Sequence, residues 1–161
     1  MTVKEYNNAV ELYSDHVYRF ILKSIRDQEK AKDIVQDAFE KLWHKVDEVD
    51  ALKCKSYLFT TAYRRMIDII RREKKQGNWN EVSEKSYSHS GHYSDLSEIL
   101  QSALAQLTEV QRSVIMLRDY EGYDYNEISE ITNLSLSQVK VYIFRARKYL
   151  KDYLVSIETV V

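Results

Sequence analysis

Residues 125–150 read YNEISEITNLSLSQVKVYIFRARKYL, which has the pattern of a short helix, a turn and a longer helix. Apolar residues recur at helical spacing in the first part, and Asn133 is a residue type that readily takes the left-handed conformation in which helices end. Ser135 and Gln138 then have the three-residue spacing of a helix N-terminal cap. A short helix, a tight turn and a capped second helix predict a helix-turn-helix.

The second of these helices is basic on the side that its apolar residues leave free. In a helix-turn-helix the second helix enters the major groove, where Lys and Arg bind guanine edges or phosphates and Gln pairs with adenine. Arg147 and Lys148 lie farther along and suit contacts to the DNA backbone. The alternative is a solvated basic helix in an ordinary bundle, but the capped turn favours DNA. The residues expected on the DNA side are Ser137, Gln138, Lys140, Val141, Phe144, Arg145, Arg147 and Lys148.

Three further helix caps precede this motif, and apolar residues at three- and four-residue spacing follow each of them. Residues 95–161 are therefore predicted to form one small helical domain. The cap pairs are Asp95 and Glu98, Thr108 and Gln111, and Asp124 and Glu127.

Residues 76–94 lack periodicity and are rich in Ser, with Gly77 and Gly91 among scattered Asn and His residues. Such a composition predicts a flexible linker. His89 and His92 form an isolated HxxH pair there, which is a weak metal-site signal because no further ligands cluster nearby. We expect no metal site and no cofactor.

The first 75 residues have the periodicity of three helices, at about residues 3–26, 27–46 and 56–75. The middle segment has the clearest amphipathic pattern in the chain. The predicted layout is an all-α protein with two small helical domains: a three-helix-type bundle at 1–75, the flexible linker at 76–94 and the helix-turn-helix domain at 95–161.

The composition fits this layout and excludes several classes of protein. The 161 residues contain no Pro and only three Gly, whereas turn-rich β folds need more of both. A single cysteine, Cys54, cannot form an internal disulfide, which favours a reducing compartment such as the cytoplasm. No apolar run has the length of a membrane span. Enzyme motifs such as HExxH and Gly-rich phosphate loops do not occur, so we expect neither catalytic residues nor a small-molecule substrate.

The net charge of −1 hides an alternation of charge along the chain. Residues 51–75 carry eight Lys and Arg against two Asp and Glu, and residues 135–161 carry five against two. The other segments are acidic, with eight against eleven in residues 1–50 and three against ten in residues 76–134. The basic segments suit phosphate contacts, and the acidic ones suit a basic partner or simple solubility.

Three motifs resemble those of the extracytoplasmic-function (ECF) family of bacterial sigma factors, in the family's order and spacing. Residues 33–43 resemble region 2.2 and residues 62–72 resemble regions 2.3 and 2.4. The resemblance to region 4 lies in residues 117–123, 127–131, 139–140 and 145–147. It implies a factor that binds core RNA polymerase and directs promoter recognition, DNA melting and transcription initiation.

The resemblance assigns the second helix to the polymerase. In the family, region 2.2 binds the clamp helices of the β′ subunit, and the β flap is a further polymerase contact. The polar outer side of residues 33–43 suits a coiled-coil partner. Phe39 and Trp43 equally fit the core of the bundle, and for Trp43 the core is the favoured interpretation. The assigned residues are Gln36, Asp37, Glu40, Lys41 and Trp43.

The resemblance assigns the third helix to the minus-ten promoter element and residues 135–150 to the minus-thirty-five element. Aromatic faces stack the bases of melted DNA, and Lys and Arg hold its backbone. By family analogy, the loop at residues 47–55 lines a pocket for a flipped base. Tyr57 fits core packing equally well. The residues assigned to the minus-ten element are Tyr57, Tyr63, Arg64, Arg65, Arg71 and Arg72.

Two other interpretations stay open. Residues 95–161 alone fit a helix-turn-helix regulator that works without polymerase, although such a protein has no need for residues 30–72. An interaction protein that merely keeps this fold is the other. Members of the family are commonly restrained by an anti-sigma factor, so such a partner is expected. Val141 and Tyr142 stand where the family frequently has Ser-Arg, so its promoter preference does not carry over.

Overall fold

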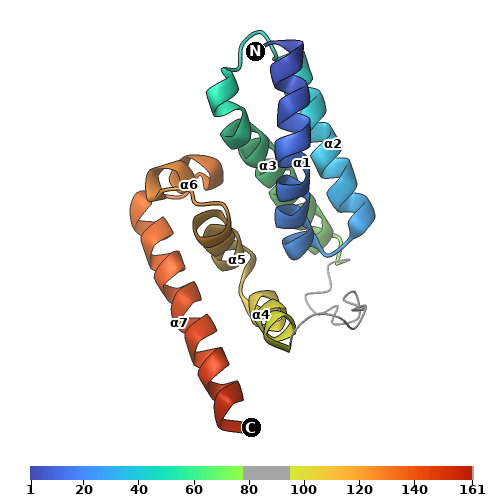
Figure 1. Cartoon of the computed structure of the whole chain (residues 1–161). Coiled ribbons are helices and arrows are strands. Elements are labelled where there is room, and N and C mark those ends of the chain that lie inside the picture. The colour runs from blue at the N-terminus through green and yellow to red at the C-terminus, as the bar shows by residue number, and fades with distance from the viewer. Residues whose placement is uncertain (78–94, 161) are drawn as a thin grey trace. The chain divides into compact units, whose positions relative to one another are not determined.

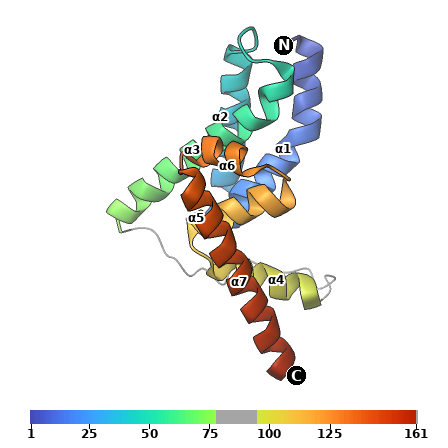
Figure 2. The same ribbon diagram turned by 90° about the vertical axis from the view of Figure 1, so that its left-hand side faces the viewer.

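The computed structural model describes residues 1–77 and 95–160, and every regular element in these ranges is helical (Figure 1, Figure 2). This confirms the all-α prediction. The chain divides into two compact units, Met1–Ser86 and Tyr87–Val161. Most of the predicted linker, including His89 and His92, lies outside the described residues, as does the side chain of Asp95.

The first unit is a bundle of three helices that pack on one another pairwise. Its third helix begins two residues earlier than the sequence predicts, because Asp50 caps the turn before it and accepts a hydrogen bond from the Leu52 backbone N–H at 3.0 Å. The elements are α1 (Val3–Ile25), α2 (Gln28–His44), the 3-10 turn η1 (Ala51–Lys53) and α3 (Cys54–Lys75).

The reversal of direction between α1 and α2 takes two residues. Arg26 ends α1 in the left-handed conformation, with φ 55°, and its N–H donates to the Leu22 carbonyl. Asp27 then accepts a hydrogen bond from the Lys30 N–H at 3.2 Å and starts α2. Because each helix end is satisfied locally, α2 folds back along α1 without a longer loop.

Large apolar side chains from all three helices fill the centre of this unit. Phe20 of α1 meets Phe59 of α3 edge to face, with ring centroids 5.4 Å apart. Near the end of α3, Ile70 is fully buried, whereas Ile69 is half-buried. Other large buried residues of the three helices include Val17, Ile21, Ile34, Leu42, Leu58 and Met66.

The second unit is built around its last helix, which packs against the three α-helices before it (Figure 1). Between residues 136 and 156 of that helix, Val139, Ile143 and Ala146 are buried, while Leu150 and Leu154, which continue the same apolar spacing, are half-buried. The elements are α4 (Asp95–Gln106), α5 (Glu109–Ile115), the π-helical turn η3 (Met116–Tyr120), α6 (Tyr125–Thr132) and α7 (Leu136–Val160).

Helices α6 and α7 form the predicted helix-turn-helix. Asn133 ends α6 with φ 60°, and the Ser129 hydroxyl donates to the Leu134 carbonyl inside the turn. The Gln138 N–H donates to the Ser135 hydroxyl at 3.1 Å, while the Gln138 amide oxygen accepts from the Ser135 N–H at 3.0 Å. The caps therefore fix both ends of the turn.

The segment after α5 differs from the regular helix that the sequence predicts. The Glu121 N–H donates to the Met116 carbonyl, five residues back, so the backbone is widened into the π-helical turn η3. The Tyr123 N–H reaches the Leu117 carbonyl, and Gly122 between them has φ +76°. A residue with a side chain is strained at that angle, which explains why Gly stands there.

Arg112 of α5 is a buried cation, only 5% exposed, that sequence reasoning did not single out. Its guanidinium donates to the carbonyls of Leu104 at 2.8 Å, Ala105 at 3.0 Å and Leu107 at 2.7 Å. These carbonyls belong to the end of α4 and the residue after it, where the helix leaves its last acceptors unsatisfied and carries partial negative charge. Arg112 therefore joins α5 to the C-terminal end of α4.

None of the helices in the described ranges has both the length and the apolar character that crossing a membrane requires.

Replacement of Arg112 by Leu is expected to lower the free energy of unfolding of the second unit by about 2–4 kcal/mol, because two buried carbonyls and one partly buried carbonyl lose their donor. Urea unfolding followed by far-ultraviolet circular dichroism measures the change. Arg145→Leu is the matched control, since Arg145 is exposed and its replacement should shift stability by about 0.5 kcal/mol or less. Equal unfolding midpoints for the two variants would contradict this role for Arg112.

Candidate nucleic-acid interface

The outward side of α7, here called the α7 face, carries every residue that the sequence predicted for DNA on this helix. All eight are exposed: Ser137, Gln138, Lys140, Val141, Phe144, Arg145, Arg147 and Lys148. Burial of Val139, Ile143 and Ala146 on the opposite side fixes the rotation of the helix. The face therefore combines cations, amide and hydroxyl groups, and two apolar side chains.

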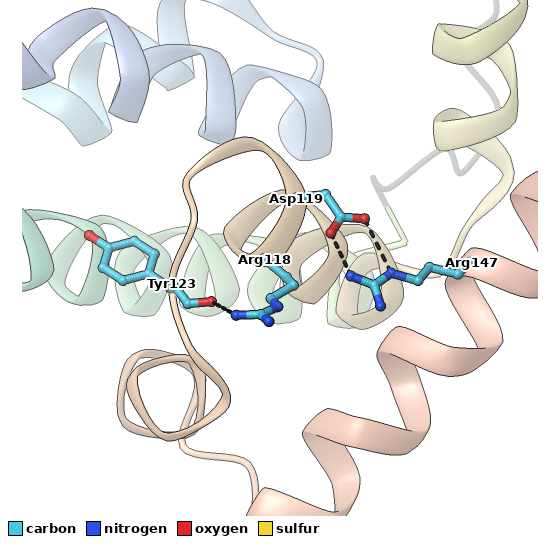
Figure 3. Close-up of polar contacts among 4 residues, drawn as sticks. All are labelled: Arg118, Asp119, Tyr123 and Arg147. Atoms are coloured by element: carbon cyan, nitrogen blue, oxygen red, sulfur yellow. Dashed lines mark hydrogen bonds and ion pairs between the residues drawn. The ribbon is translucent and has the colours of Figure 1, made fainter.

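Arg147 is bound within the protein rather than pointing freely to solvent. Its Nη2 lies 2.6 Å from one Asp119 carboxylate oxygen, and its Nε lies 3.3 Å from the other (Figure 3). The hydrogen bond to Asp119 raises the pKa of Arg147 above its ordinary value. A phosphate that approaches Arg147 therefore competes with the Asp119 carboxylate for the guanidinium.

The neighbouring Arg118 points to the other side of η3. Its Nη1 donates to the Tyr123 carbonyl at 2.9 Å (Figure 3). The guanidinium also lies over the Tyr125 ring, 4.8 Å from its centroid, and the Lys140 ammonium lies 5.9 Å from the same centroid. Tyr125 therefore orients a cation of the α7 face. The sequence analysis did not identify Tyr125. An aromatic residue at the start of α6, just before the basic helix α7, could have indicated a cation–π contact.

Gln138 has a structural role that limits its role in recognition. Its amide oxygen accepts the Ser135 N–H in the cap, which leaves the amide nitrogen as the group available to a base. Bidentate pairing with adenine needs both the oxygen and the nitrogen of the amide. The capping geometry therefore does not favour the adenine contact that the sequence suggested.

The basic side of α3, here called the α3 face, is formed by Arg64, Arg71 and Arg72, which are exposed, and by Arg65, which is half-buried. Arg65 Nε lies 3.6 Å from the Asp37 carboxylate of α2. This ion pair joins a residue predicted for the minus-ten DNA to one predicted for the polymerase.

The two tyrosines predicted for the α3 face differ from each other. Tyr57 is half-buried, whereas Tyr63 is only 6% exposed. The sequence interpretation of Tyr63 as a platform for unstacked bases requires an accessible ring, which the structure does not present. The helical period places Tyr63 beside Met66 and Ala62 on the buried side of α3, and that position explains the difference.

The outward side of α2, here called the α2 face, carries Gln36, Glu40, Lys41 and Trp43, which are exposed, and Asp37, which is half-buried. The favoured interpretation of Trp43 as a core residue is wrong, because its side chain is 45% exposed. Phe39 is the neighbouring aromatic residue that enters the core.

Trp43 is held in place from α1. The Tyr6 ring meets the Trp43 ring edge to face, with centroids 5.0 Å apart, and the Tyr6 hydroxyl donates to the Phe39 carbonyl at 3.0 Å. Burial raises the pKa of Tyr6. An exposed indole with a fixed orientation is typical of a protein-binding surface.

Other chemistry has little support in the described ranges. Within them, no three His, Cys, Asp or Glu side chains cluster as metal ligands would. Cys54 lies buried at the start of α3, and burial raises the pKa of its thiol. A protonated, buried thiol is a poor nucleophile.

Comparison with known proteins places both units in one family. Residues 9–76 match the family described as Sigma-70 region 2, and residues 97–150 match Sigma-70, region 4. The chain is 30% identical over 148 residues to the RNA polymerase sigma factor SigV of Bacillus subtilis, covering 88% of each protein. It is 28% identical over 156 residues to the ECF RNA polymerase sigma factor SigM of the same species, covering 94% of each.

A solved structure is also similar. The sigma factor RpoE from Bartonella quintana, crystallised in complex with the anti-sigma factor NepR, matches with a TM-score of 0.77 and 25% identity. The match covers 94% of this chain and 98% of that one.

Replacement of Asp119 by Asn is expected to strengthen binding of the full chain to a DNA duplex by about two- to fivefold, because Arg147 is released from an exposed ion pair. Fluorescence anisotropy with a labelled duplex at low salt measures the affinity. Asp152→Asn is the matched control, since it removes the same charge from an exposed position on α7. An equal gain in both variants would indicate a general charge effect and would contradict competition for Arg147.

Proposed function

The chain belongs to the extracytoplasmic-function (ECF) sigma factors, and we propose that it binds core RNA polymerase through the α2 face and promoter DNA through the α3 and α7 faces. As a sigma factor it directs promoter recognition and the initiation of transcription. The observation that carries the proposal is that one chain presents two basic helical faces, one on each compact unit, and that the first unit also has a third face with an exposed tryptophan.

The α2 face suits the clamp helices of the polymerase β′ subunit. Trp43 offers a large apolar surface whose orientation Tyr6 already fixes, so little side-chain entropy is lost on binding. Glu40 and Lys41 beside it are exposed and select a partner by charge. We also expect a contact between the second unit and the β flap.

The α3 face suits the minus-ten element. Arg64 and Arg72 lie eight residues apart on one helix, roughly 12 Å along its axis, and follow a DNA backbone across more than one phosphate. Tyr57 remains the more accessible of the two tyrosines for a melted base, because Tyr63 is buried.

The α7 face suits the major groove of the minus-thirty-five element. The exposed half of α7 follows directly from the capped turn, which is the position of the reading helix in this motif. Lys140 and Arg145 carry the hydrogen-bond donors for guanine edges and phosphates.

Three further features complete the proposal. The chain acts in the cytoplasm, where the polymerase is. It works by binding rather than by catalysis. An anti-sigma factor restrains it, as the complex of the similar RpoE with NepR suggests.

Purified chain mixed with core RNA polymerase and genomic DNA fragments is expected to start transcription at a defined set of promoters. Sequencing the 5′ ends of the transcripts maps these start sites. Core polymerase alone and the chain alone are the controls, and each should give no defined start sites. If the mixture gives only the background of core polymerase, the chain is not a sigma factor.

Replacement of Glu40 by Lys is expected to weaken binding to core polymerase about tenfold, because it reverses a charge on the α2 face beside Trp43. Glu40 is preferred to Asp37 because Asp37 also pairs with Arg65, so a change there disturbs the DNA-binding helix. Glu11→Lys makes the same charge change on the exposed side of α1 and should leave binding unchanged. Affinity is measured by anisotropy of the labelled chain. If the two variants bind polymerase equally well, the α2 face is not the docking surface.

A further inference from the structure

Two apolar side chains stand in the middle of the α7 face. Phe144 is 69% exposed and Val141 is 43% exposed, although both types of side chain are favourable in a core. At helical spacing, Ser137, Val141, Phe144 and Lys148 form one outward ridge of α7. Side chains with this much exposure contribute little to the stability of the second unit. We therefore ask which molecule they bind.

The charges around this pair identify the class of partner. Lys140 lies on one side of the ridge, Arg145 lies on the other, and Lys148 follows on the next turn; all three are exposed. Cations on both sides of a narrow ridge complement the two rows of phosphates that border a DNA groove. A protein partner for an apolar patch has no general need for this arrangement.

We propose that Val141 and Phe144 recognise the 5-methyl groups of thymine in the major groove of the upstream promoter element. This inference rests on the proposed function, in which α7 enters that groove. The thymine methyl is the apolar group that the base-pair edges present in the major groove, and apolar side chains bind it. The side chains of Val and Phe form no hydrogen bonds with a base edge, so they can distinguish one base from another only through contact with this methyl group.

The remaining polar groups of the α7 face fit the same base. Lys140 and Arg145 only donate hydrogen bonds, while the acceptor of Gln138 is engaged in the cap with Ser135. Thymine presents the O4 acceptor next to its methyl group, so a donor beside an apolar side chain matches it. On the surface of α7, Lys140 neighbours Phe144 and Val141 neighbours Arg145, because the members of each pair are four residues apart. Donors alone also match the O6 and N7 acceptors of guanine, so the methyl contacts of Val141 and Phe144 are what favours thymine on the contacted strand.

The experiment compares thymine with uracil, which differs only by the 5-methyl group. A promoter that fires in the transcription experiment above is synthesised with thymidine or with deoxyuridine in its upstream element. Holoenzyme made from the full chain and core polymerase is titrated against each duplex. Each contacted methyl that is lost is expected to weaken binding about three- to fivefold. Deoxyuridine placed outside the element should have no effect.

Variants show which side chain is responsible. Val141→Ser is expected to weaken binding to the thymine duplex and to remove the difference between thymine and uracil at one position. Phe144→Ser should do the same at another position. Lys148→Ala is the matched control, because loss of a phosphate contact weakens binding to both duplexes equally and leaves their ratio unchanged. All three residues are exposed, so the fold should be unaffected.

Three results would each overturn the inference while leaving the sigma-factor function intact. The first is equal binding of the thymine and uracil duplexes, and the second is a promoter whose upstream element lacks thymine. The third is a Val141→Ser variant that binds core polymerase more weakly in the absence of DNA. The last result would assign the patch to the polymerase. If no promoter fires at all, the proposed function fails, and this inference fails with it.

Discussion

Burial of one apolar side of each helix positions nearly all the exposed groups that we assign to binding in this sigma factor. In α7, Val139 and Ile143 have no freedom to rotate out of the core, so Val141 and Phe144 must face solvent. In α2, burial of Leu42 has the same effect on Glu40 and on the indole of Trp43. Because these groups lie on helices and not on loops, their spacing is fixed before a partner arrives, and binding costs less conformational entropy. The apolar period of the sequence thus decides the geometry of binding as well as the fold.

Ion pairs between helices adjust this geometry without locking it. Asp119 holds Arg147 on the α7 face, and Asp37 holds Arg65 on the α3 face. The side chains of both pairs are more than a third exposed, so each pair stabilises the fold by about 1 kcal/mol or less and is weakened by salt. A DNA phosphate can therefore replace the carboxylate at small cost. The Asp37–Arg65 pair has the further property of joining two faces that we assign to different partners, so occupation of one face changes the charge available at the other.

The parts of this structure that depend on local signals were predictable from the sequence, and the parts that depend on distant contacts were not. The cap at Ser135 and the left-handed end at Asn133 follow from residue type and spacing, and both occur as expected. The exposure of Trp43 and the burial of Tyr63 do not follow from residue type and spacing. Each residue lies at the edge of an apolar stripe, where packing by another helix decides its exposure. For Trp43 that helix is α1, whose Tyr6 supports one edge of the indole and leaves the rest in solvent. The residue-level assignments on the three faces remain predictions.

The segment from α5 to η3 contains the buried cation Arg112, which no sequence pattern predicted. Four successive apolar residues of this segment, Val114 to Leu117, are buried, and α4 ends beside it with carbonyls that lack helical donors. Arg112 supplies three hydrogen bonds to that end, which offsets the cost of burying its charge. Seven residues later, the π-helical turn directs Asp119 toward Arg147 of α7. One short segment thus contacts both neighbours: Arg112 binds the end of α4, while α5 packs against α7 and Asp119 of η3 adds an exposed ion pair to it. The α7 helix is oriented against the rest of its unit as a result.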